Sequence, residues 1–257
     1  MKKYLIVTLT ALMAVTATMS QEYKLAKSSG KLVINLSSVR VEGYNGTEII
    51  FSNDREDHES DERAKGLHPI NGSGLIDNTN IGINVTDKGG IIEVNQVSSR
   101  DNKIKIMVPR GVTIKYDYNK VMDAGNASFK NIESELEVSV LHNSLSLENV
   151  TGPMTVKAVY GSIDAKFKEG MKGPISLVSI YGHVDVALPV ATKANISMKT
   201  SYGEILASGE LKIEMEKNND SDMIRYSNNN VKGKLNGGGL ELSLRSDYSK
   251  IYLRKAN

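Results

Sequence analysis

The chain has 257 residues, with 32 lysine and arginine residues against 30 acidic ones, and it contains no cysteine and no tryptophan. This balance argues against nucleic acid as a partner, because phosphate binding requires clustered basic residues. The lack of cysteine excludes disulfides and argues against a structural zinc site. With only three phenylalanines, a core must be built from aliphatic side chains.

The first twenty residues are typical of a secretory signal peptide. Lys2 and Lys3 give a positive start, residues 4–15 are apolar except for two threonines, and small residues follow up to Ser20. The apolar run is shorter than the roughly 20 residues that a spanning helix needs. We therefore expect residues 1–20 to be removed on export, which leaves basic and acidic residues balanced. The expected location is the periplasm, the outer membrane or cell surface, or the medium.

Residues 21–110 predict an irregular β region made of short strands. Alternating or continuous apolar runs between turn residues indicate strands, here at residues 32–36, 39–41, 48–51, 81–85, 90–97 and 103–108. The one long break, residues 52–80, holds a run of mixed charge at residues 54–63. A break of this length predicts a functional or mobile loop, and mixed charge favours a solvated one.

A repeat occupies residues 111–257. Three similar segments begin at Met154, Ile175 and Ile196, spaced by 21 residues, an earlier copy begins at Leu136 and a late copy at Leu242. Within each copy, apolar and polar residues alternate on both sides of a turn, which indicates two short strands.

The copy that begins at Ile175 illustrates the unit. Gly182 follows its first strand, and we expect this glycine to supply the positive φ of a tight bend. One two-strand unit cannot bury its apolar face alone, whereas stacked copies cover one another. The sequence therefore predicts an all-β fold, a β-solenoid of about 21-residue units, in a single domain over residues 21–257. An immunoglobulin-like sandwich is the alternative.

Tyr160, Tyr181, Tyr202 and Tyr248 recur at one position of the unit, and His142 takes the same place in the earlier copy. In a stack these rings would form a column along one face. One interpretation is a ladder that stabilises the stack, because aromatic pairs add about 0.5–1.5 kcal/mol beyond burial. The other is a flat aromatic strip on which a glycan or another extended ligand lies. These tyrosines are the candidate binding residues.

Other chemistry has weaker support. Asp164 and Asp185 share a repeat position and should lie on neighbouring turns, but Leu206 ends that column, and solvated surface carboxylates are the simpler interpretation. No histidine pair has metal-ligand spacing. The calcium-like stretch 218–222 lacks glycine and glutamate at the positions where Met223 and Asn229 stand. No catalytic residue, metal or cofactor is predicted.

The chain resembles the DUF4097, or "putative adhesin", family in the form found in exported Bacteroidetes proteins. The resemblance lies in the tyrosine–glycine repeats and in residues 62–67, 77–79, 149–153 and 231–239. It implies a β-solenoid-like fold and an envelope or surface location, and it brings no catalytic residues. We therefore expect a non-enzymatic envelope protein with a binding or structural role, contacting a glycan or a surface protein. The alternatives are a polysaccharide-active β-helix enzyme and an assembly protein that pairs through its terminal strands.

Overall fold

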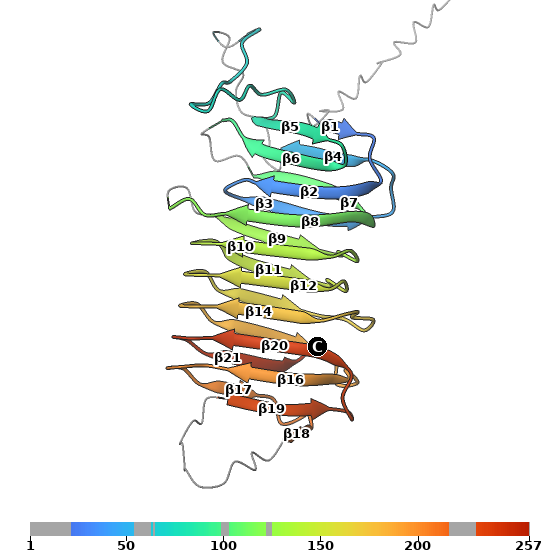
Figure 1. Cartoon of the computed structure of the whole chain (residues 1–257), viewed down its shortest axis with the longest axis vertical. Helices are drawn as coiled ribbons and strands as arrows, with labels where there is room; N and C mark the ends of the chain where they lie inside the picture. The colour runs from blue at the N-terminus through green and yellow to red at the C-terminus, as the bar shows by residue number, and fades with distance from the viewer. Residues whose placement is uncertain are drawn as a thin grey trace, which may run out of the picture.

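A computed structural model describes residues 22–53, 63, 65–98, 103–121, 125–215 and 230–256. All named elements there are β-strands, and they form a ten-stranded sheet and an eleven-stranded sheet, called sheet A and sheet B below. Figure 1 shows the strands stacked along one long axis, which confirms the predicted all-β solenoid. The proposed signal peptide, most of the charged run and the stretch 218–222 lie outside the described residues.

The stack consists of rungs, each giving one strand to sheet B and the next strand to sheet A. The rungs are β2 (Ser29–Asn35) with β3 (Val39–Tyr44), β6 (Ile91–Gln96) with β7 (Ile104–Pro109), β8 (Gly111–Tyr118) with β9 (Asn126–Lys130), β10 (Leu136–Val140) with β11 (Ser144–Glu148), β12 (Met154–Ala158) with β13 (Ile163–Lys166), β14 (Ile175–Ser179) with β15 (Val184–Leu188), β16 (Ala194–Lys199) with β17 (Ile205–Ala207), and β20 (Leu240–Ser246) with β21 (Ile251–Lys255).

Neighbouring rungs pair in parallel and in register, so like side chains lie above one another. In sheet B, Leu136, Met154, Ile175 and Leu242 are successive partners, and all point inward with at most 3% exposure. The core between the sheets is aliphatic, as the composition predicts, and burying each such side chain contributes about 1.5–3 kcal/mol. Because a one-residue slip would turn every apolar side chain outward, this alternation fixes the register.

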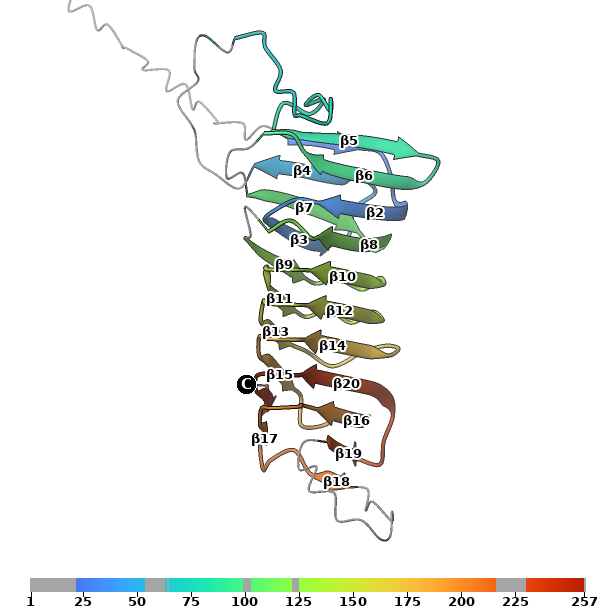
Figure 2. The same cartoon turned by 60° about the vertical axis from the view of Figure 1, so that its left-hand side comes forward.

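The spatial order of the rungs differs from their order in the sequence. The last rung, β20 with β21, lies between β14–β15 and β16–β17, and pairs in parallel with both. The first rung, β2 with β3, likewise lies between β6–β7 and β8–β9. Figure 2 shows β20 above β16 in this part of the stack. The first and last rungs of the sequence thus each lie one rung in from an end of the parallel stack.

Antiparallel strands close the two ends of the stack: β1 (Glu22–Leu25), β4 (Ile49–Asn53) and β5 (Ile83–Lys88) at one end, β18 (Ile213–Met215) and β19 (Asn230–Leu235) at the other. The segment just before β5 is tied down by side chains. The Asp77 carboxylate accepts hydrogen bonds from the backbone N–H groups of Thr79, Asn80 and Gly82 at 2.8–2.9 Å. The Asn78 side chain bonds both the N–H and the carbonyl of Val85 in β5, at 2.9 and 2.8 Å.

Candidate functional site

Four tyrosines and one histidine form a column of stacked rings at the corner where the chain leaves sheet B for sheet A. Neighbouring ring centroids are 4.8–5.0 Å apart and the ring planes are within 7–14° of parallel. The order along the column is His142, Tyr160, Tyr181, Tyr248, Tyr202, so the ring of the last rung lies between those of the second and third tyrosine–glycine copies. The predicted column is confirmed, in an order that the sequence does not give.

The backbone holds these rings at rung spacing. The amide N–H of each tyrosine donates to the carbonyl that precedes the neighbouring ring residue, as Tyr181 does to Val159 at 2.8 Å and Tyr248 to Ile180 at 2.9 Å. The same bond recurs for Tyr160 and Tyr202 at 2.8 Å. The hydrogen-bond ladder of the sheets therefore continues around the corner, and it holds the backbones of the ring residues at the spacing of the rungs.

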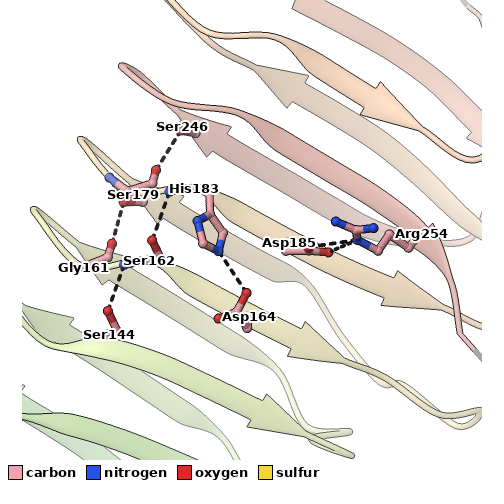
Figure 3. Close-up of polar contacts among 10 residues, drawn as sticks. Ser144, Gly161, Ser162, Asp164, Ser179, His183, Asp185, Ser246 and Arg254 are labelled. Atoms are coloured by element: carbon pink, nitrogen blue, oxygen red, sulfur yellow. Dashed lines mark hydrogen bonds and ion pairs between the residues drawn. The ribbon is translucent and has the colours of Figure 1, made fainter.

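Beneath the rings, buried hydroxyl groups connect one corner to the next (Figure 3). Ser179 is fully buried; its hydroxyl donates to the Gly161 carbonyl at 2.8 Å and accepts from the Gly182 N–H at 2.9 Å. Ser246 donates in the same way to the Gly182 carbonyl at 2.9 Å, and Thr200 accepts from the N–H that follows Tyr202. Sequence analysis missed this ladder, although its signal was present: a serine or threonine two residues before three of the tyrosines.

The glycine after the tyrosine has a different role from the one predicted. The φ of Gly182 is not positive, unlike that of other turn glycines such as Gly170 at 89°. The reason for glycine is close approach, because a Cβ on Gly182 would lie 2.3 Å from the carbonyl oxygen of Gly161 in the neighbouring rung. A Cβ on Gly161 or Gly203 would lie 1.8 or 1.7 Å from a neighbouring carbonyl oxygen. The tyrosine–glycine pair lets the corners stack at the spacing of paired strands.

The ring geometry determines what the column presents to a ligand. Near-parallel rings with centroids 4.8–5.0 Å apart are stacked with an offset, so neighbouring rings cover part of each other's faces. Each inner tyrosine has a ring on both faces, whereas Tyr202 has a ring neighbour on one face only. Accordingly Tyr202, which ends the column, is 75% exposed, against 48–53% for the other three tyrosines. No described protein group hydrogen-bonds to these four phenol oxygens, which are available to a ligand.

On the sheet A side, charged side chains form pairs across rungs (Figure 3). Asp164 and Asp185 are direct neighbours in β13 and β15, as predicted. The partner of Asp185 in the next rung is Tyr252 and not Leu206, because β21 is inserted there. The Nε–H of Arg254 is shared between the two carboxylate oxygens of Asp185, at 2.8 and 2.9 Å, and this pairing raises the pKa of the guanidinium.

Asp164 also has a basic neighbour in the adjacent rung. Asp164 Oδ1 lies 3.0 Å from His183 Nε2, so each aspartate has its own basic partner. An open hollow of about 590 Å³ on sheet A contains Asp164 as its one described carboxylate, beside Arg40, Lys103 and serine hydroxyls. Glycoside hydrolysis usually requires two carboxylates that flank the bound sugar. The described lining of the hollow provides one carboxylate, Asp164.

Metal binding has no matching cluster in the part of the chain that the structure describes. No group of three or more histidine, aspartate or glutamate side chains is close enough there to hold an ion. Two histidines have other contacts, since His142 stacks on Tyr160 and His183 faces Asp164. Within the same residues, no helix is long and apolar enough to cross a membrane.

The fold and the ring column together define a capped β-solenoid with an exposed aromatic edge. No protein-family model and no curated protein matches the chain. Among solved structures, it is similar to a putative cell adhesion protein from Clostridium sporogenes, with 13% identity and a TM-score of 0.44 over 92% of this chain and 99% of the other. It is also similar to a putative adhesin from Bacteroides fragilis, with 10% identity and a TM-score of 0.32 over 91% and 95%. Values this low carry no argument about function.

Proposed function

We propose that this protein is an exported, non-enzymatic envelope protein that uses the tyrosine edge to contact a glycan or another surface molecule. The observation that carries the proposal is the row of phenol hydroxyls, free of described protein partners and fixed at one per rung. Tyrosine contributes contact area and a hydrogen-bonding tip at low conformational cost, because it has few rotatable bonds. In this protein that cost is lower still, since each ring is held between its neighbours.

The N-terminal pattern supports the export part of the proposal. Residues 1–20 have the charge, apolar stretch and small residues of a signal peptide. Envelope proteins contact extended polymers and other cells, and a long rigid edge with a repeating hydrogen-bonding group fits such a target. Stability without disulfides comes from the continuous aliphatic core along the stack.

The experiment is a glycan-array screen of the mature chain, residues 21–257, beside two variants. In the first variant Tyr160, Tyr181, Tyr248 and Tyr202 are replaced by phenylalanine, which keeps the stacked rings and removes the hydroxyls. In the second the same four become alanine. We expect saturable binding that both variants lose, with the phenylalanine variant as stable as the wild type. No binding by a folded wild type would refute the proposal and leave the rings as a stabilising ladder.

A further inference from the structure

The outer face of sheet B beside the tyrosine column carries a row of basic side chains. Lys157, Arg245 and Lys199 each stand three residues before a tyrosine of the column, on β12, β20 and β16. Strand register places them in one line, with Val178 between the first two and Lys199 directly beside Arg245. All three basic residues are exposed. The row therefore runs parallel to the phenol hydroxyls along the stack.

At the β18–β19 end of the stack, basic and acidic side chains both join this face, since Glu214 of β18 is the cross-strand partner of Lys234 and Glu241 of β20 is the partner of Asn195. There β19 pairs with β16 and adds exposed Lys232 and Lys234, which face the same side as Ser197 and Asn195. Arg245 is neutralised by Asp247, which accepts two hydrogen bonds at 2.8 Å. For the four lysines of this face, Lys157, Lys199, Lys232 and Lys234, no carboxylate of the described residues lies within ion-pair distance. Elsewhere on the strands, ion pairs neutralise many of the lysines, such as Lys130 with Glu148.

A third row on this face consists of hydroxyl groups. Thr155, Ser176, Ser243 and Ser197 are partners in successive strands, each two residues before the basic row. Every rung from β12 to β16 thus presents a side-chain hydroxyl and a phenol at about 4.8 Å spacing, and every rung except that of β14, where Val178 stands, adds a basic side chain. A surface that repeats in one direction is complementary to a ligand that repeats in one direction.

We propose that this face, the tyrosine edge included, binds a linear acidic polysaccharide lying along the solenoid axis. The inference rests on the proposed function and names the ligand class. The unpaired lysines call for carboxylate or sulfate groups, and the hydroxyl rows call for a polymer rich in hydroxyls. A single-stranded nucleic acid fits less well, because its bases need open aromatic faces for stacking and each inner tyrosine here already has a ring on both faces. Each exposed ion contact is weak and screened by salt, so affinity depends on many contacts along one polymer.

The test uses the mature chain, residues 21–257, with four probes: polygalacturonate, dextran sulfate, neutral dextran and single-stranded DNA. We expect binding of the acidic polysaccharides, weakened at least tenfold by 0.5 M NaCl. The variant Lys157→Glu with Lys199→Glu should also bind at least tenfold more weakly. The control variant Lys166→Glu with Lys168→Glu changes the net charge equally but lies outside this face, at and just after the end of β13, and should bind like the wild type. Comparing the two acidic probes separates carboxylate from sulfate recognition.

Four results would overturn the inference. Equal loss in the control variant would show that only net charge matters, and stronger binding of DNA would assign the face to nucleic acid. Binding of neutral dextran as tight as that of the acidic probes, lost in the tyrosine variants, would overturn the acidic class while leaving the proposed function intact. No binding of any probe, together with a negative glycan array, would refute both this inference and the proposed function.

Discussion

The insertion of the last rung can be tested with pairs of cysteines, because the chain has none of its own. In the structure Ser176 of β14 and Ser243 of β20 are partners, and Ser243 is in turn the partner of Ser197 in β16. Paired strands are about 4.8 Å apart, so Ser176 and Ser197 should be about 9.6 Å apart. A disulfide requires Cα atoms about 4.4–6.8 Å apart. The pair Ser176→Cys with Ser243→Cys should therefore oxidise, and Ser176→Cys with Ser197→Cys should not.

The expected effect on stability follows from the loop that the disulfide closes. Residues 176 and 243 are about 67 positions apart, and closing a loop of that length in the unfolded chain is worth about 4 kcal/mol at most. We expect the oxidised variant to unfold at higher urea concentration than its reduced form. Cross-linking is measured by the gel shift of the oxidised chain and by titration of free thiols.

A positive control and a refuting result complete the design. Thr155→Cys with Ser176→Cys joins β12 to β14, which are neighbours in either arrangement, and should oxidise readily. If the control and the Ser176–Ser197 pair oxidise while the Ser176–Ser243 pair stays reduced, the rungs stack in sequence order. The order of the tyrosine column and of the basic row would then be wrong as well.

Three further predictions concern single side chains, each measured by urea unfolding. Gly182→Ala should lower the free energy of unfolding by about 3 kcal/mol or more, because the new Cβ would lie 2.3 Å from a carbonyl oxygen. The control Gly209→Ala, whose Cβ would meet nothing within 4 Å, should change it by no more than about 0.5 kcal/mol. Similar values for the two variants would contradict the close-approach argument. Tyr116→Phe removes a buried phenol that donates to a backbone carbonyl at 2.9 Å, so a loss of about 1–2 kcal/mol is expected and an unchanged midpoint would count against it. The pKa of Asp247 is lowered chiefly by its hydrogen bonds from Arg245, so this pair stabilises the fold above about pH 4 and the contribution is lost as pH falls through the folded-state pKa. Asp247→Asn should therefore flatten the fall in stability between about pH 4 and pH 2, and equal slopes would refute the assignment.

The sequence was sufficient to predict the rung, because each strand alternates inward aliphatic and outward polar residues and each copy repeats the pattern. It was also sufficient to predict the ring column, since like positions of in-register rungs must lie above one another. It could not predict which rungs are neighbours. Leu242 has the same inward role as Ile175 and Ile196 and pairs with both. The copies are interchangeable in pattern, so the order depends on how the connections and end strands pack.

The glycines show a second limit of the same kind. A glycine in a turn pattern can mean positive φ or close approach of backbone, and one sequence cannot separate the two. At Gly170 the first reason holds, and at Gly182 the second. The buried hydroxyls of Ser179 and Ser246 explain why the approach is so close, because they bond a carbonyl of the neighbouring rung. The buried hydroxyl ladder and the close approach at Gly182 thus belong to the same corner, and the sequence analysis missed both.

The ends of the stack bear on where a partner would bind. Unpaired edge strands invite pairing with other chains, and proteins prevent this with short or covered edges. At the C-terminal end β17 and β18 have three residues each. At the other end β1 has four residues, and the Asn78 side chain occupies the N–H and carbonyl of Val85 on the outer edge of β5. Assembly through terminal strands, one of the alternatives from the sequence, would have to displace the Asn78 contacts at the β5 edge and would find only short strands at the other edges. The tyrosine edge and the basic row beside it are open along several rungs, which favours the side of the solenoid over its ends as the contact surface.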